Sequence, residues 1–188
     1  MRVIAGEAKG RPLKGPRTSG TRPTSDRVRE ALFDILAPYV ERARVLDLYA
    51  GTGALAIEAL SRGADSADLV EADRTAQAVI ADNLERTGLK SRARLWRMRV
   101  EKALPQLGPQ YDVILADPPY ADAHIQSVLA QLGSLIADEG LVAIEHATRV
   151  ALPDAAPELR LWKRRRHGDT TLSLYKRVSR PERRENDA

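Results

Sequence analysis

The sequence has no cysteine, only three histidines and few aromatic residues. Without cysteine there are no disulfides and no thiolate metal ligands, and His124, His146 and His167 are too scattered to indicate a metal cluster. No apolar run approaches the roughly eighteen residues of a membrane helix, and no long apolar segment follows the first basic residue as in a secretion signal. The 188 residues are therefore predicted to form one cytoplasmic domain that folds without a metal or disulfides.

The net charge of +4 is unevenly distributed. Residues 1–30 carry 8 Lys and Arg against 3 Asp and Glu, and residues 160–188 carry 10 against 4. Residues 31–159 carry 12 against 19. Basic ends beside an acidic body suit a polyanionic partner such as nucleic acid, although ordinary solvated charge explains the composition equally well.

From residue 44 onward, short apolar runs alternate with longer segments of helical period. This alternation predicts a parallel sheet with helices on both faces, that is, a doubly wound α/β fold. Gly63, Gly88 and Gly140 are expected to end helices. The predicted strands are 44–50, 67–73, 92–98, 111–117 and 140–147, and the predicted helices are 53–63, 74–88, 100–108 and 122–140.

The two ends depart from this alternation. Residues 1–24 are predicted to be a basic extension, a short hairpin followed by a linker rich in Gly, Pro, Ser and Thr. The main domain, residues 25–178, begins with an amphipathic helix and closes with an antiparallel hairpin on the edge of the sheet, whose two strands are separated by the turn "HGD". Residues 179–188 are charged and predicted to be disordered.

The segment "GTGALA" follows the first predicted strand and satisfies the G-x-G-x-x-G/A pattern. Gly51 and Gly53 would let the backbone approach a ligand closely, at a helix N-terminus with free N–H groups. Glu71, eighteen residues beyond Gly53, ends the second strand and could accept the hydroxyls of a ribose, with Asp73 as the alternative acid. The pattern predicts a cofactor that contains adenosine.

Asp47 favours one such cofactor over another. It lies four residues before Gly51, where a carboxylate is poorly placed against the pyrophosphate of a nicotinamide dinucleotide. The same carboxylate is well placed against the cationic amino and sulfonium groups of S-adenosylmethionine. We therefore favour the methyl donor, and a role for Asp47 in capping or hydrogen-bonding the loop stays open.

The fourth parallel strand ends in Asp117, Pro118, Pro119 and Tyr120, at the edge of the sheet where ligands of open α/β folds bind. The prolines stiffen this corner, and neither has an N–H to satisfy. A carboxylate, fixed carbonyl oxygens and a flat ring suit a planar amine, whose N–H groups they would accept and on whose nitrogen they would stabilise charge.

The chain resembles the bacterial RsmD family of Rossmann-like class I methyltransferases over about residues 1–177. The resemblance rests on "MRVIAGEAKGRPLKGP", "TRPTSDRVREALFDIL", "LDLYAGTGALAIEALSRGA", "DPPY", "GLVAIEH" and "GDTTLSLYKR", in this order. It implies methyl transfer from S-adenosylmethionine to the N2 amine of guanine 966 in 16S ribosomal RNA. We expect the protein to be a monomer, and the choice between free RNA and an assembled small-subunit particle as the substrate stays open.

The resemblance also implies residue roles. Asp47, Gly51 and Gly53 would contact the methionine part of the cofactor and Glu71 its ribose, while Asp117 would face both the cofactor and the target amine. The family usually has an acid or amide followed by alanine after the third strand, where this chain has Arg99-Val100, so an apolar or backbone contact from Val100 is expected instead. Basic residues expected to hold RNA phosphates around a flipped guanine are Arg2, Lys9, Arg11, Lys14, Arg22, Lys163, Arg164, Arg165 and Arg166.

Other functions remain open on the residues alone. The same corner would serve an amino-methyltransferase of DNA adenine or cytosine, or of a protein glutamine. Asp117 only accepts hydrogen bonds, so it suits the adjacent N1–H and N2–H donors of guanine slightly better than the mixed edge of adenine. A nicotinamide-dependent oxidoreductase and a non-enzymatic RNA-binding module are more distant alternatives. His146 is predicted to be structural rather than catalytic.

Overall fold

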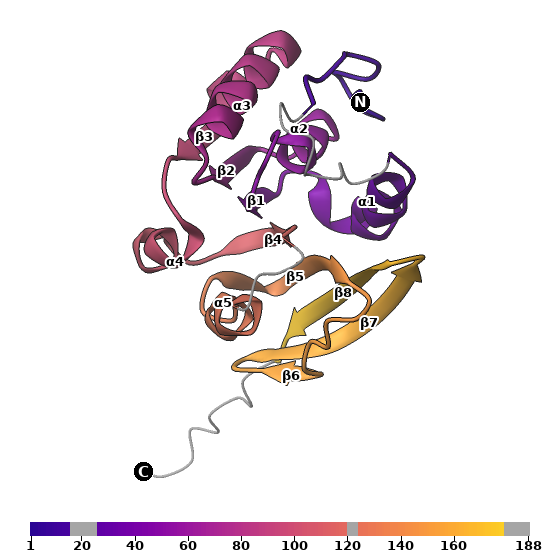
Figure 1. The fold of residues 1–188 in the computed structure, drawn as a ribbon, viewed down its shortest axis with the longest axis vertical. Helices are drawn as coiled ribbons and strands as arrows, with labels where there is room; N and C mark the ends of the chain where they lie inside the picture. The colour runs from indigo at the N-terminus through magenta and orange to yellow at the C-terminus, as the bar shows by residue number, and fades with distance from the viewer. Residues whose placement is uncertain (16–25, 120–123, 179–188) are drawn as a thin grey trace, which may run out of the picture.

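The computed structural model describes residues 1–15, 26–119 and 124–178, and the strands in this part of the chain form one eight-stranded sheet (Figure 1). The strands are β1 (Arg44–Leu48), β2 (Ser66–Val70), β3 (Ala93–Trp96), β4 (Tyr111–Ala116), β5 (Ile136–Ala147), β6 (Ala155–Ala156), β7 (Leu159–His167) and β8 (Thr170–Arg177). Their order is β3-β2-β1-β4-β5-β8-β7-β6. β1 to β5 pair in parallel and β5 to β8 antiparallel, so the doubly wound fold with a C-terminal hairpin is confirmed.

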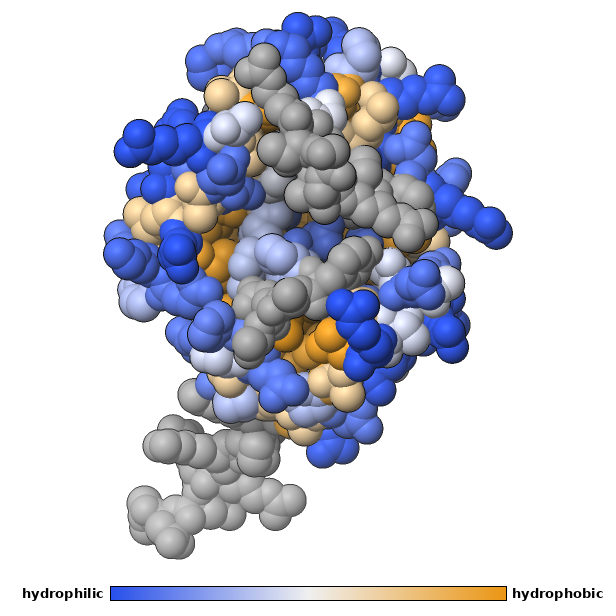
Figure 2. Space-filling view, viewed as in Figure 1, coloured by the Kyte–Doolittle hydropathy of each residue, from blue (hydrophilic) through white to orange (hydrophobic). Residues whose placement is uncertain are grey.

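Helices cover both faces of this sheet. They are α1 (Asp26–Val40), α2 (Ala54–Ser61), α3 (Arg74–Thr87), α4 (Val100–Ala103) and α5 (Ile125–Leu132), with short 3-10 helices at Lys90–Arg92 and Leu104–Gln106. α1, α2 and α3 pack into one hydrophobic core, the α1-side core, and α4 and α5 pack into a second on the opposite face, the α5-side core. Hydrophilic side chains cover much of the face shown in Figure 2, and hydrophobic ones are visible between them. No helix of the described residues is long and apolar enough to span a membrane.

Successive strands are added on one side of β1 up to β3, and on the other side of β1 from β4 onward. β1 pairs with β2 on one side and with β4 on the other, although β4 follows only after β2 and β3. Ligands of open α/β sheets bind beyond the carboxyl ends of the strands at such a switch point. The ends of β1, β2 and β4 are therefore the expected site.

One predicted element is wrong. Residues 122–140 were expected to form a single helix, but α5 ends at Leu132 and β5 begins at Ile136. Gly140 does not end a helix; it lies inside β5, where an added Cβ would come 2.9 Å from the Asp112 carbonyl oxygen of β4. Only glycine allows this close approach of two strands, which helical periodicity cannot reveal.

Several predictions concern the ends of the chain. The predicted N-terminal hairpin consists of a single antiparallel bridge between Arg2 and Pro12. The C-terminal hairpin is present, and Gly168 in its turn has a φ of 62°. The linker with Arg22, the corner residue Tyr120 and the charged tail after Val178 lie outside the described residues.

Candidate active site

The glycine turn after β1 is built from a run of left-handed backbone conformations. Gly51 and Gly53 have φ values of 57° and 75°. An added Cβ at Gly53 would also lie 3.2 Å from the Leu69 side chain, whereas one at Gly51 would meet only a backbone oxygen at 3.9 Å. Gly53 is thus favoured by tight packing as well as by backbone conformation, while Gly51 leaves open space above the turn.

Tyr49 begins this run with a φ of 61°, which the sequence did not indicate. A bulky residue in this conformation costs on the order of 1–3 kcal/mol, and such strain concentrates at functional sites. The Ala50 N–H donates to the Val70 carbonyl oxygen at 3.0 Å, which ties the turn to the end of β2. The strained turn is therefore held by the sheet itself.

Glu71 joins the glycine turn to the end of β2. Its Oε2 accepts a hydrogen bond from the Gly51 N–H at 2.8 Å, and its Oε1 accepts one from the Asp73 N–H at 2.8 Å. The Asp73 carboxylate instead caps α3 by accepting from the Ala76 N–H at 2.8 Å. Of the two acids that the sequence offered, Glu71 is the one fixed against the turn.

Asp47 lies beneath the turn and is 1% exposed. Burial raises the pKa of this carboxyl to about 8, and repulsion from the carboxylates of Asp117 and Glu71 acts in the same direction. Its Oδ2 accepts from the Ala56 N–H at 3.1 Å, which opposes the shift only in part. The hydrogen-bonding role left open for Asp47 is thus observed, close to the carboxylates of Asp117 and Glu71.

Asp117 and the two prolines leave β4 next to the end of β1. The register pairs Ala116 with Leu48, and the Asp117 N–H continues this ladder to the Leu48 carbonyl oxygen at 3.4 Å. Asp117 is partly buried, Pro118 is buried and Pro119 is exposed. The first three residues of the predicted corner therefore lie beside the glycine turn.

Val100 and His146 occupy packed positions near this edge. Val100 is 4% exposed, begins α4 and belongs to the α5-side core, against which Tyr49 packs. The two ring nitrogens of His146 lie 2.8 Å from the Ser173 Oγ and 3.1 Å from a backbone carbonyl oxygen, and burial lowers the pKa of the ring. These contacts make His146 a neutral, structural residue.

The predicted RNA-binding residues fall into two groups. Arg2, Lys9, Arg11 and Lys14 lie on the N-terminal segment over α2 and α3, and Lys163 to Arg166 lie on β7. Arg11 donates to the Arg86 carbonyl oxygen at 2.7 Å, and Lys14 pairs with Asp82 at 2.9 Å. Arg164 pairs with Asp154 at 3.2 Å. Several of these cations therefore already have partners on the protein.

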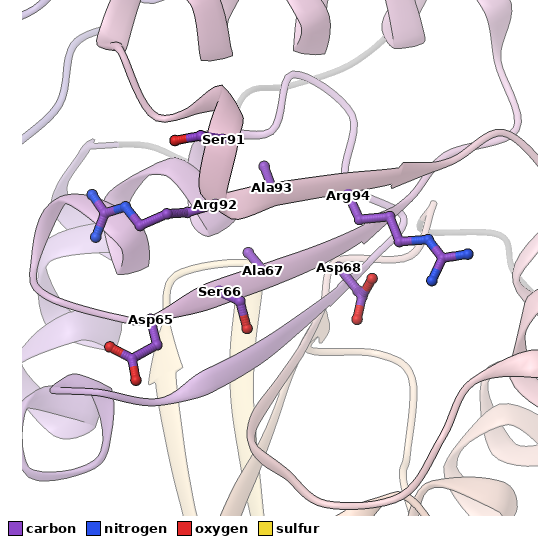
Figure 3. A pocket seen from close by; sticks show the side chains of 8 residues that line it. All are labelled: Asp65, Ser66, Ala67, Asp68, Ser91, Arg92, Ala93 and Arg94. Atoms are coloured by element: carbon purple, nitrogen blue, oxygen red, sulfur yellow. The ribbon is translucent and has the colours of Figure 1, made fainter.

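A shallow cavity of about 260 Å³ lies away from this edge, at the amino ends of β2 and β3 (Figure 3). Asp68 and Arg94, cross-strand partners, line one end, and Asp65 and Arg92 line the other. Its charges balance, and its acids and bases make structural contacts such as the 2.8 Å hydrogen bond from the Trp96 indole to Asp68. Among the described residues, no group of three or more His, Asp or Glu could hold a metal ion.

Comparisons with known proteins agree with this geometry. A family model described as "Conserved hypothetical protein 95" matches residues 1–176. A protein of Escherichia coli K12 named ribosomal RNA small subunit methyltransferase D is 35% identical over 184 residues, 97% of this chain and 92% of that protein. The chain belongs to the RsmD family. A solved structure of an E. coli methyltransferase, 36% identical with a TM-score of 0.84, covers 96% of this chain and 99% of its own.

Two further comparisons mark how far the likeness to the RsmD family extends. A solved protein of Thermus thermophilus is 37% identical with a TM-score of 0.80 and covers 95% of this chain and 99% of its own. The ribosomal protein uL3 glutamine methyltransferase of Burkholderia pseudomallei is 39% identical, but over only 51% of this chain and 34% of its own length. The likeness to a glutamine methyltransferase is therefore confined to part of the chain.

Proposed function

We propose that this protein transfers a methyl group from S-adenosylmethionine to the exocyclic N2 amine of a guanine in 16S ribosomal RNA. The observation that carries the proposal is the position of Asp117 and Pro118 beside a glycine turn that Glu71 and Asp47 hold from below. Full-length likeness to a protein named ribosomal RNA small subunit methyltransferase D supports RNA as the substrate.

The acids of the site fit the proposed cofactor. Asp47, Glu71 and Asp117 repel one another, which favours a cationic ligand and disfavours a pyrophosphate. When bound, S-adenosylmethionine would supply an electrophilic methyl group on a positively charged sulfur. Glu71 has lone pairs left for ribose hydroxyls, the open space at Gly51 admits the methionine part, and Val100 offers an apolar surface.

The target amine is proposed to be held by the corner. A guanine N2 amine is a weak nucleophile because its lone pair is delocalised into the ring. The Asp117 carboxylate and a proline carbonyl oxygen would accept its N–H groups, turn the lone pair out of conjugation and stabilise the developing positive charge. The amine proton then leaves to Asp117 or to water. By resemblance Tyr120 would stack on the base.

The cofactor part is tested by isothermal titration calorimetry with S-adenosylmethionine and with NADH. We expect binding of S-adenosylmethionine and none of NADH. Binding of NADH alone would favour the oxidoreductase alternative. The monomer is tested by sedimentation, where a single species of 20.7 kDa is expected.

The substrate part is tested by radiolabelled methyl transfer to free 16S ribosomal RNA and to small-subunit particles from a strain that lacks the enzyme. Mass analysis of digests should find N2-methylguanosine. Preferred methylation of duplex DNA, or of a glutamine in protein uL3, would overturn the assignment.

Variants of the corner separate chemistry from structure. Asp117→Ala should lower kcat by about 10²–10³-fold while cofactor affinity changes little. Asp65→Ala is the matched control, because Asp65 is an exposed carboxylate at the opposite edge of the sheet. Loss of cofactor binding by Asp117→Ala, with folding intact, would mean that the corner serves the cofactor rather than the amine.

A further inference from the structure

The β7–β8 hairpin carries an exposed tryptophan outside the site described above. Trp162 is 45% exposed. The Lys176 Nζ lies 4.7 Å from the centre of the Trp162 ring and 5.4 Å from that of Tyr39, and the Lys163 Nζ lies 5.3 Å from the Trp162 ring. Because Tyr39 is on α1, Trp162 lies on the face of the sheet that α1 covers.

A β-bulge gathers these groups on one face. The pairing of β7 with β8 shifts between Leu161 and Lys163, so Trp162 is an extra residue in the strand. Without the bulge, strict alternation would place Lys163 on the face opposite Trp162 and Arg164 beside it. With it, Lys163 joins Trp162, and Arg164 turns to the α5 side, where it donates to the Ser173 Oγ and the Leu152 carbonyl oxygen.

Further cations share this face, because directly paired residues of neighbouring strands point to the same side. Arg160 pairs with Lys176. Arg165 pairs with Leu172, a member of the α1-side core. We call the resulting group the Trp162 surface; it consists of Arg160, Trp162, Lys163, Arg165 and Lys176.

The cations of the Trp162 surface have no acidic partner in the part of the chain that the structure describes. Among the described residues, the ion pairs include none of its four cations. On the opposite face of the same hairpin, Arg164 pairs with Asp154 and Arg177 pairs with Glu158. On that face only Arg166 has no ion pair among the described residues, whereas on the Trp162 surface none of the four cations has one, and such a concentration of unpaired cations attracts an anion.

An exposed aromatic ring among unpaired cations matches single-stranded nucleic acid. Bases stack on tryptophan whatever their sequence, and the flanking phosphates neutralise lysine and arginine. The two lysine ammonium groups lie over the ring, as in ordinary cation–π contacts at a protein surface, but they leave nearly half of Trp162 open. A purely apolar partner would leave the four cations buried and unpaired.

The Trp162 surface extends to the active-site edge of the sheet. Arg165 pairs with Leu172, which pairs with Glu145, one residue beyond the Ile144 that pairs with the last residue of β4. Arg165 is therefore level with the exit of β4. Three strand spacings separate them, about 14 Å at roughly 4.8 Å each. A nucleotide chain that enters the site can cross this face.

We propose that the Trp162 surface binds an unpaired segment of the RNA substrate next to the target nucleotide, with one base stacked on Trp162 and phosphates on its cations. The identification of the ligand as RNA rests on the proposed function. The stacking interaction itself depends only on the geometry of the hairpin.

Fluorescence tests the stacking directly. The chain has two tryptophans, and Trp96 is partly buried with its indole bonded to Asp68. Titration with a short single-stranded RNA should quench the emission of Trp162, and Trp162→Phe should abolish this quenching while it retains most of the affinity. Quenching that persists in Trp162→Phe would overturn the proposal.

Kinetics test the effect on turnover. Trp162→Ala should raise the KM for 16S ribosomal RNA about 5- to 150-fold, with kcat, the Kd for S-adenosylmethionine and the melting temperature nearly unchanged. Lys176→Gln should raise KM less, and Lys102→Gln on α4 is its matched control. An unchanged KM for free RNA overturns the proposal, even if assembled particles are affected, because that pattern means a contact with ribosomal protein.

The two proposals fail in different ways. If no RNA is methylated but short RNA still quenches Trp162, the proposed function fails and the surface stands. If RNA is methylated with the same KM by wild type and Trp162→Ala, the surface fails and the function stands. A dimer that dissociates in Trp162→Ala would identify the surface as a contact between two copies of the chain and overturn RNA binding there.

Discussion

The two basic regions of the chain differ in how they are held. The N-terminal segment, residues 1–15, is fixed to the body by buried polar side chains. Glu58 on α2 accepts hydrogen bonds from the N–H groups of Ile4 and Ala5 at 2.8 and 3.0 Å. The β7–β8 hairpin is held chiefly by strand pairing along the sheet. The N-terminal segment is therefore held by side-chain contacts, including the buried Val3, Ala8 and Leu13, whereas the hairpin is held mainly by backbone bonds.

Asn83 connects the N-terminal segment to the cofactor side. It is fully buried, and its Oδ1 accepts from the Lys14 N–H at 2.8 Å. Its Nδ2 donates to the Lys14 carbonyl oxygen at 3.2 Å and to the Thr52 carbonyl oxygen at 2.9 Å. Since Thr52 is in the glycine turn, the Asn83 side chain supports both the N-terminal segment and this turn.

The cations of the two regions differ as well. Arg11 and Lys14 of the N-terminal segment bond to α3, whereas Lys163 and Arg165 of the hairpin make no ion pair with the described residues. A count of charges along the sequence treats these regions alike. Pairing in the folded chain decides which charges remain available to a polyanion.

The largest expected effect is on the anchoring of the N-terminal segment. Glu58→Ala should lower the free energy of unfolding by about 3–5 kcal/mol, because it leaves two backbone N–H groups and the Arg62 guanidinium without their buried acceptor. Urea unfolding measures this, and Glu30→Ala on the exposed face of α1 should change it by less than about 0.5 kcal/mol. A loss as small as that of the control would mean that the segment contributes little to stability.

The next effect concerns Asp47, which lies beneath the glycine turn. The N-terminal segment contacts this turn through Asn83, and the hairpin makes no such link among the contacts described above. Asp47 has its pKa raised to about 8, so the folded protein binds a proton there that the unfolded chain releases above about 4. Stability should therefore fall as pH rises from 4 to 8 and then level off. Asp47→Asn should remove this dependence and gain a few kcal/mol above pH 8.

The same variant separates stability from binding. Asp47→Asn should weaken S-adenosylmethionine binding although the apo protein becomes more stable. Wild-type affinity should rise with pH toward 8, as the carboxyl ionises. Thermal unfolding and calorimetry across pH 5 to 9 check both trends. If the stability of Asp47→Asn equals that of wild type at every pH, Asp47 is not a buried, protonated acid in the folded protein.

A smaller effect tests the link through Asn83. Asn83→Ala should cost about 1–3 kcal/mol, since it leaves the Thr52 carbonyl oxygen and the Lys14 backbone unpaired, and it should also weaken S-adenosylmethionine binding. Trp162→Ala is expected to alter neither quantity. Asp82→Asn removes only the surface pairs with Lys14 and Arg86 and serves as the local control. Equal cofactor affinity in Asn83→Ala and wild type would show that the N-terminal segment and the cofactor site are not coupled.

The smallest effect compares the charges of the two regions. RNA affinity measured against salt should lose about 0.7–0.9 of its logarithmic slope for each phosphate contact removed. Lys163→Gln with Arg165→Gln should therefore reduce the slope more than Arg11→Gln with Lys14→Gln. The reverse order would mean that RNA displaces the N-terminal pairs and that the hairpin cations are not used.

Local patterns predicted most of the fold and much of the candidate site. Periodicity located the strands and helices because each is a local structure, and the rule that ligands bind at carboxyl ends of parallel strands placed Asp47, Glu71 and Asp117 at one edge. The exception is Gly140, which was predicted to end a helix. Its place in β5 depends on a close contact with β4, which is distant in sequence and leaves no local pattern. The left-handed Tyr49 and the roles of Glu58 and Asn83 were missed for the same reason.

The sequence by itself determined the alternation of elements, the glycine turn, the acids and the stiff corner, because these depend on residues close together in the chain. Only the tertiary structure decided which acid bonds the turn, which cations are paired and which face of β7 carries Trp162. Those outcomes depend on partners that are distant in sequence and, for the cations beside Trp162, on a one-residue bulge that reverses the side-chain alternation beyond it.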